Sequence, residues 1–192
     1  MNAKDLIREQ LEESRAVLDK LINEPAMLEK IQHASDIVAD AIRSGNKVLS
    51  CGNGGSMCDA MHFAEEMTGK FREERKPLPA IAISDPSHLT CVANDYGFKM
   101  VFARYVEALG RKGDVLLALS TSGNSENILE AVKSAHAAGV TVIALTGKNG
   151  GQLAMEADLS IIIPHEGNSD RIQEMHIKII HILIYLVEQM VK

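Results

Sequence analysis

Short apolar runs alternate with helix-like segments through most of the chain, and this alternation limits the possible folds more than any other feature. The apolar runs lie at residues 47–51, 80–84, 114–119, 140–146 and 159–164, with helical patterns between them at 57–67, 97–110, 126–138 and 152–156. Several runs are continuously hydrophobic, as in parallel strands that are covered on both faces. The pattern predicts an α/β fold with a doubly wound, mostly parallel five-stranded sheet and right-handed crossovers.

Helical segments at both ends lie outside this alternation. Residues 1–45 contain two amphipathic stretches with a 3.6-residue period, and Ser44-Gly45-Asn46 ends the second. Residues 171–191 predict a long helix whose second half is apolar nearly all round, so that it needs a cover on two sides. We therefore expect one domain over 1–192, made of a helical extension (1–45) and an α/β core (46–192), and an oligomer interface that covers the final helix.

Composition narrows the class of protein. There are 20 Lys and Arg against 26 Asp and Glu, a formal charge of −6, which argues against broad binding to nucleic acid or a membrane surface. No apolar run approaches the roughly 20 residues of a spanning helix. Three cysteines without a CxxC pair fit a reducing cytosol, where we expect them to be small core residues. The sequence predicts a cytoplasmic protein.

Doubly wound sheets bind ligands beyond the carboxyl ends of their strands, and this rule picks out loops at residues 52–56, 85–95, 120–125, 147–151 and 165–170. Two of these loops could hold an anion. Residues 51–56 read Cys-Gly-Asn-Gly-Gly-Ser, and such a turn exposes backbone N–H groups at a helix start. The loop lacks the Gly-Lys-Ser/Thr of a P-loop and the spaced glycines of dinucleotide sites, so a simple turn is the alternative.

The second loop follows the run at 114–119 and is rich in hydroxyl groups. It reads Ser120-Thr121-Ser122-Gly123-Asn124-Ser125. Capping of the next helix by Ser125 or Asn124 accounts for one or two of these residues, but not for four hydroxyls. With no P-loop lysine or magnesium carboxylate nearby, the loop favours a small phosphate monoester over a nucleoside triphosphate.

Ionisable side chains on two helices are candidates for chemistry. His62 and Glu66 are four residues apart, so they share a helix face and could bind a metal, act as an acid–base pair or form an ordinary surface contact. Glu65 points about 100° away and is expected to be solvated. His181 lies in an apolar block, where the alternative is a core histidine bonded to a carbonyl. Gln173 and His181 are separated by about 12 Å of helix rise, so sharing one ion requires different subunits or a wide site.

The motifs together resemble one known family. CGNGGS, HFAEE, TCVANDYGF, GDVLLALSTSGNS, TGKNGG and RIQEMHIKIIHILI are similar to the bacterial phosphoheptose isomerase family of sugar-isomerase (SIS) domains, over essentially the whole chain. The resemblance implies isomerisation of D-sedoheptulose 7-phosphate to D-glycero-D-manno-heptose 7-phosphate through an enediol, the first step toward the heptose of the lipopolysaccharide core. It also implies one zinc ion per subunit and a homotetramer with sites at subunit contacts.

Carried over by position, the resemblance implies a substrate site, a zinc site and a catalytic pair. The substrate-binding residues would be Asn53, Gly54, Gly55, Glu66, Asn94, Asp95, Ser120, Thr121, Ser122, Ser125, Asp170 and Gln173. The zinc ligands would be His62, Glu66, Gln173 and His181. Glu66 would move a proton between C1 and C2 of the sugar, and His181 would transfer protons between the two oxygens. Lys70 stands where the family has arginine, and lysine lacks the bidentate fork of arginine.

Other functions remain open at this stage. One alternative is a non-catalytic SIS protein that binds the bacterial replication initiator, but that relative lacks equivalents of Glu66 and His181. Another is an isomerase for pentose or hexulose phosphates, although pentose-phosphate members usually carry a regulatory domain. A nucleotide-binding switch is least favoured, because the phosphate loops lack its lysine and its magnesium ligand.

Overall fold

A five-stranded parallel sheet forms the centre of the molecule in the computed structural model, which describes residues 2–192. The strands are β1 (Val48–Gly52), β2 (Ala80–Ala82), β3 (Val115–Ser120), β4 (Thr141–Gly147) and β5 (Leu159–Ile163). Their order is β2-β1-β3-β4-β5, and every neighbouring pair is parallel. The predicted fold class is therefore confirmed.

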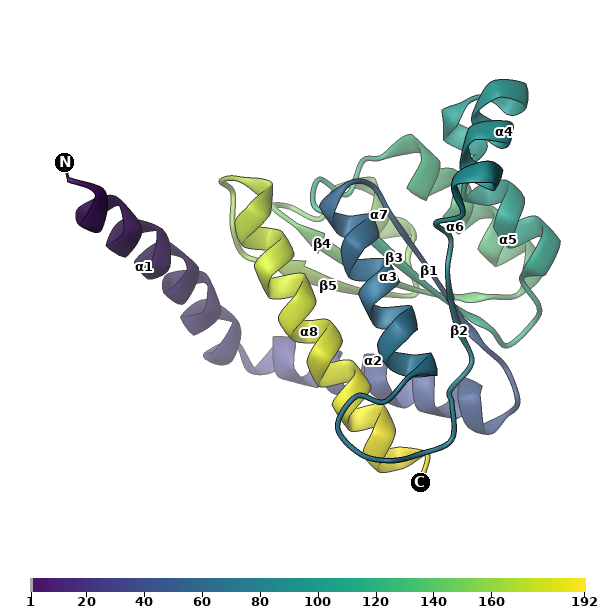
Figure 1. The fold of residues 1–192 in the computed structure, drawn as a ribbon, viewed down its shortest axis with the longest axis horizontal. Coiled ribbons are helices and arrows are strands. Elements are labelled where there is room, and N and C mark those ends of the chain that lie inside the picture. The colour runs from purple at the N-terminus through teal and green to yellow at the C-terminus, as the bar shows by residue number, and fades with distance from the viewer. Residues whose placement is uncertain (1) are drawn as a thin grey trace.

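Helices cover both faces of the sheet (Figure 1). They are α1 (Ala3–Ile22), α2 (Pro25–Arg43), α3 (Gly55–Thr68), α4 (Pro86–Tyr96), α5 (Ala103–Leu109), α6 (Glu126–Ala138), α7 (Gly151–Glu156) and α8 (Ser169–Met190), with a 3₁₀ helix, η1, at Phe98–Met100. Successive strand residues point to opposite faces, so Leu117 packs into a core with α2, α3 and α8, while Leu116 packs into a second core with α4, α5 and α6. This burial explains the continuous apolar runs.

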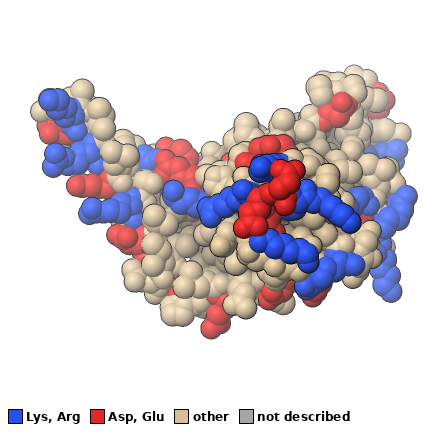
Figure 2. Space-filling view, turned by 60° about the horizontal axis from the view of Figure 1, so that its bottom comes forward, with Lys and Arg blue, Asp and Glu red and all other residues tan. Residues whose placement is uncertain are grey.

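The terminal helices leave apolar side chains uncovered. The first half of α1 extends away from the body (Figure 1), and Leu6, Ile7 and Leu11 are 49%, 59% and 68% exposed. One side of α8 is fully buried, whereas Ile182 and Tyr185 on its other side are 40% and 39% exposed. No helix among residues 2–192 has the length and hydrophobicity to span a membrane. Figure 2 shows basic and acidic side chains next to one another on the face turned forward.

Three local predictions are wrong in whole or in part. Residues 85–95 were expected to form a loop at a strand end, but most of them form α4, which begins with a capping bond from the His88 backbone N–H to Asp85 (2.8 Å) and with Pro86 in its first turn. The helix expected at 97–110 is divided into η1 and α5. Of the three cysteines, Cys51 is buried as expected, whereas Cys58 and Cys91 are exposed.

Candidate active site

A cavity of about 280 Å³ lies where the chain order of the sheet reverses, between β1 and β3. In sheets of order 2-1-3-4-5 this switch point is the usual ligand site. The lining residues come from the loops after β1 and β3 and from the start of α8: Asn53, Gly54, Gly55, Ser56, Leu119, Ser120, Thr121, Ser125, Ser169 and Gln173. The two loops predicted from sequence therefore meet in one cavity.

Three helices begin at this cavity. Their N-cap residues are Gly54 for α3, Ser125 for α6 and Asn168 for α8, and none of the three makes a side-chain capping bond. In the first turns, the N–H of Ser56 donates to the carbonyl oxygen of Asn53 and that of Arg171 to the carboxylate of Asp170. The N–H groups of Gly55, Glu126 and Ser169 make no hydrogen bond within the described residues. The positive ends of three helix dipoles and these donors together favour an anion such as a phosphate.

The cavity walls depend on close backbone packing at two glycines. Gly55 lies so near α8 that a Cβ there would be 2.6 Å from Oε1 of Gln173. Gly123 has a φ of +66°, and a Cβ there would be 1.9 Å from the carbonyl oxygen of Gly150. Glycine at 123 therefore allows the loop after β3 to lie against the loop after β4.

The predicted hydroxyl groups divide into two sets. Ser120 and Ser125 lie within hydrogen-bond distance of each other at 3.1 Å, and Thr121 donates to Ser169 at 3.3 Å, all four lining the cavity. Ser122 does not line it; its hydroxyl accepts a hydrogen bond from the backbone N–H of Asn124 at 3.2 Å. Ser169 adds a further hydroxyl; it lies in the strand-end segment 165–170 that the sequence indicated, but it was not among the predicted site residues.

Asn127 is a second missed residue, and it joins the two loops. Asn53 and Asn127 exchange two amide hydrogen bonds, of 2.9 and 2.8 Å, across the switch point. Asn127 is 3% exposed. Nothing in the local sequence indicated the pairing, since the partners are 74 residues apart.

A cluster of ionisable side chains lies along the same two helices, α3 and α8, which run side by side (Figure 1). Nε2 of His62 is 3.6 Å from Oε1 of Glu66 and 2.9 Å from Nε2 of His181. The predicted catalytic pair and one further predicted zinc ligand are therefore brought together within one chain. His176, also on α8, is the core histidine: it is fully buried and bonded to the carbonyl oxygen of Thr146 at 3.0 Å.

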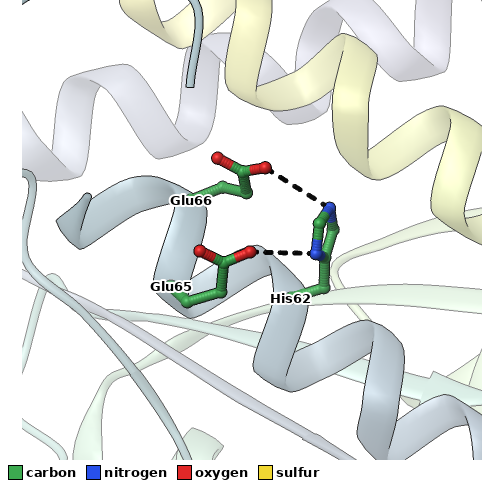
Figure 3. Close-up of side chains that lie close together, drawn as sticks. All are labelled: His62, Glu65 and Glu66. Atoms are coloured by element: carbon green, nitrogen blue, oxygen red, sulfur yellow. Dashed lines mark ion pairs between the residues drawn. The ribbon is translucent and has the colours of Figure 1, made fainter. Parts of the chain in front are cut away.

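Glu65 is solvated, as expected, but it also contacts His62. Its side chain is 62% exposed, but Oε1 lies 3.0 Å from Nδ1 of His62. In Figure 3 the two carboxylates contact opposite nitrogens of the same ring. An ion held by Nε2 of His62 and by Glu66 would leave Glu65 as the partner that orients the ring.

The donor set at Nε2 fits zinc. Nε2 of His62 lies near an imidazole nitrogen of His181 and a carboxylate oxygen of Glu66, and these are ligand types that zinc prefers in catalytic sites. The ligand atoms that all lie within 4.8 Å of one another are those of His62, Glu65 and Glu66. Partial burial lowers the pKa of His181, the charge of His62 lowers it further, and Glu66 opposes the shift. A lowered pKa keeps His181 neutral near pH 7, which is the form that binds a metal or accepts a proton.

Asp59 is a further ionisable group that sequence reasoning did not single out. Burial raises its pKa to about 6, an effect that His62 partly offsets, and its Oδ2 atom is buried without a hydrogen-bond partner. It lies one turn before His62 on α3.

Several predicted site residues lie elsewhere. Asn94 and Asp95 are exposed at the end of α4, where the Asn94 amide donates to Asp95 at 2.7 Å, and neither lines the cavity. Asp170 is exposed and accepts a bond from the backbone N–H of Arg171. Gln173 lies against Gly55, two helical turns before His181. This placement agrees with the expected 12 Å separation on α8.

Comparison with known proteins defines the class of this fold and site. Residues 10–147 match the model of the SIS domain. The chain belongs to the SIS-domain family.

Within the SIS domains, the chain belongs to the phosphoheptose isomerase family. The chain is 63% identical to a phosphoheptose isomerase of Cytophaga hutchinsonii over 180 residues, which cover 94% of each chain. The solved phosphoheptose isomerase of Francisella tularensis superposes with a TM-score of 0.93 at 40% identity, covering 98% of this chain and 100% of that one. The corresponding structure from Neisseria gonorrhoeae gives a TM-score of 0.91, also at 40% identity, with coverage of 98% and 100%.

Proposed function

We propose that this protein is a phosphoheptose isomerase, an aldose–ketose isomerase that converts D-sedoheptulose 7-phosphate to D-glycero-D-manno-heptose 7-phosphate. The observation that carries the proposal is the layout of α3 and α8. Both helices begin at the cavity described above, and farther along His62 lies 3.6 Å from Glu66 and 2.9 Å from His181. A sugar phosphate bound by its phosphate in the cavity would extend its carbonyl end along α3 and α8 toward these side chains.

The chemistry follows from the two groups expected at the reacting carbons. A carboxylate can take a proton from one carbon and return it to its neighbour, while an imidazole moves protons between the two oxygens. Glu66 suits the first role and His181 the second. Thr121, Ser125 and the N–H groups of three helix starts would hold the phosphate and fix the sugar.

We further propose that His62, Glu66 and His181 hold one zinc ion per subunit, with Gln173 as the fourth ligand that the family resemblance implies. Zinc would polarise the substrate carbonyl. Gln173 and His181 are two turns apart on α8, so we expect the Gln173 ligand to reach a neighbouring site in a homo-oligomer. Asn94, Asp95 and Asp170, which lie outside the cavity of one chain, would then contact substrate across a subunit boundary.

The exposed apolar side chains support an oligomer. Leu6, Ile7 and Leu11 on α1, with Ile182 and Tyr185 on α8, form surfaces that a second copy would cover. We propose a tetramer on the family resemblance. The free thiols of Cys51, Cys58 and Cys91 suit a reducing compartment, and we place the protein in the cytoplasm.

Turnover of sedoheptulose 7-phosphate by the purified protein tests the proposal. We expect activity in the native protein and a loss of at least about 100-fold in Glu66→Gln and in His181→Gln. His33→Gln, at an exposed position on α2, is the control and should retain full activity. Absence of turnover with correct folding would favour a non-catalytic SIS protein, and preference for a shorter ketose phosphate would favour another phosphosugar isomerase. Full activity in both site variants would refute the assigned roles.

A further inference from the structure

Arg75 forms the most extensive side-chain network next to the candidate site without being part of it. Its Nη2 donates to the carbonyl oxygen of Glu66 at 2.7 Å, and its Nη1 donates to those of Met67 and Gly69 at 2.9 and 3.2 Å. Its Nε donates to Oε1 of Glu188 at 2.8 Å. The two side chains are 8% and 1% exposed, so this is a buried ion pair.

The carbonyl groups that Arg75 contacts are those that a helix end leaves without partners. Helix α3 ends at Thr68 and has no basic residue in its last turn. Arg75 comes from the segment that follows and supplies the missing donors, together with the backbone N–H of Leu78, which donates to Met67 at 2.9 Å. The end of α3 is thus held by a side chain that is itself fixed to α8.

Glu188 lies two helical turns beyond His181 on α8. The Arg75–Glu188 pair therefore joins α3 and α8 just beyond the place where Glu66 and His62 approach His181. At the opposite end, α3 is set against α8 by the close approach of Gly55 to Gln173. Two fixed points, one on each side of the ionisable cluster, determine how far α3 can slide along α8.

We propose that Arg75 and Glu188 are positioning residues that set the distance of Glu66 and His62 from His181. The inference rests on the roles proposed above for these three residues. Arg75 touches Glu66 only through its backbone carbonyl, and it acts on the reaction through the placement of α3.

A role in stability alone does not explain the arrangement. Burial of an ion pair costs desolvation that its attraction often fails to offset, and apolar replacements of both partners are commonly neutral or stabilising. The neighbouring ion pairs lie at the surface. The side chains of Lys70 and Glu74 are 61% and 87% exposed, and those of Lys192 and Glu73 are 46% and 54% exposed. Such surface pairs contribute little. The distinctive property of the Arg75–Glu188 pair is its geometry: it links one helix end to the other helix.

The test separates position from stability by using a double variant. Arg75→Met/Glu188→Leu places apolar side chains at both positions and leaves no unpaired buried charge, but it removes the donors to the carbonyl oxygens of Glu66 and Gly69. Its melting temperature should therefore fall, and kinetics and zinc binding are measured at a temperature where the variant is folded. We expect kcat for sedoheptulose 7-phosphate to fall about 10- to 100-fold, because small displacements of reacting groups have effects of this size. KM should change less than about twofold, since the phosphate cavity lies at the other end of α3. Zinc affinity, measured by competition with a chelator, should fall about tenfold.

Single conservative variants and a matched control complete the design. Arg75→Lys keeps the charge but cannot make the forked contacts, so it should reproduce the loss in kcat and in zinc affinity. Arg111 donates to the carbonyl oxygens of Ala108 and Gly110 at the end of α5, away from the site, and Arg111→Lys should leave both unchanged.

Native kcat and zinc affinity in the folded double variant and in Arg75→Lys would overturn the inference. So would an equal loss in Arg111→Lys. Glu66→Gln separates this failure from failure of the proposed function: if Glu66→Gln is inactive while the Arg75 variants are fully active, the positioning role alone is wrong.

Discussion

Gly123→Ala is the substitution for which the structure predicts the sharpest effect. Gly123 lies between Ser122 and Asn124 in the loop that carries the phosphate hydroxyls. Its backbone N–H donates to Ser120, and its carbonyl oxygen accepts from Leu153 of α7 at 2.9 Å. A Cβ at this position would lie 1.9 Å from the carbonyl oxygen of Gly150, and contacts under 3.0 Å force one partner to move.

Two contributions set the magnitude. A non-glycine residue with φ near +66° costs about 1–2 kcal/mol in backbone strain, and the stiffer unfolded chain returns about 0.4–1 kcal/mol of this. The collision requires a shift of about 1 Å in one of two packed loops, and overpacking of this kind costs about 1–3 kcal/mol more. The same shift displaces Ser120, Thr121 and Ser125 relative to one another.

A matched glycine isolates the collision. Gly45 has a φ of +83° with nothing within 4 Å of an added Cβ, so Gly45→Ala carries the backbone strain alone. Urea unfolding should show Gly123→Ala to be less stable than Gly45→Ala by about 1–3 kcal/mol. Calorimetric titration with inorganic phosphate should show at least about tenfold weaker binding in Gly123→Ala and native binding in Gly45→Ala. Equal stability and equal phosphate affinity in the two variants would refute the reasoning.

Three further predictions follow from the buried and exposed groups. Burial lowers the pKa of His176 to about 4, so the folded state holds the ring neutral. As the pH falls from 6.5 toward 4, the unfolded chain binds this proton first, and the free energy of unfolding should decrease by about 3 kcal/mol. Urea unfolding at pH 7 and 4.5 should show a smaller pH dependence in His176→Gln. Asn127→Ala leaves the amide of Asn53 unpaired and should cost about 1–3 kcal/mol in unfolding free energy while raising KM; an unchanged KM would contradict the role of the pair in shaping the cavity. Leu11→Glu, on the exposed part of α1, should give a smaller species in analytical ultracentrifugation, and a native assembly size would remove α1 from the proposed interface.

Much of the fold could be predicted because its signals are local. Continuous apolar runs bounded by glycine and polar residues indicated buried parallel strands, and the carboxyl-end rule then indicated the loops after β1 and β3. The error at residues 85–95 was one of interpretation, since Asp85-Pro86 is itself a helix-start signal. The exposure of Cys58 and Cys91 was not predictable from residue type, because either face of a helix can carry a small side chain.

The sequence by itself determined what depends on spacing along one element: the parallel sheet, the two anion loops and the shared face of His62 and Glu66. The tertiary structure alone decided what depends on contacts between distant elements. His181 reaches His62 across 119 residues, Asn127 reaches Asn53 across 74, and Glu188 reaches Arg75 across 113. The periods of helices and strands determine the direction in which a side chain points from its own element. Which other element it contacts depends on how the two cores pack on the sheet.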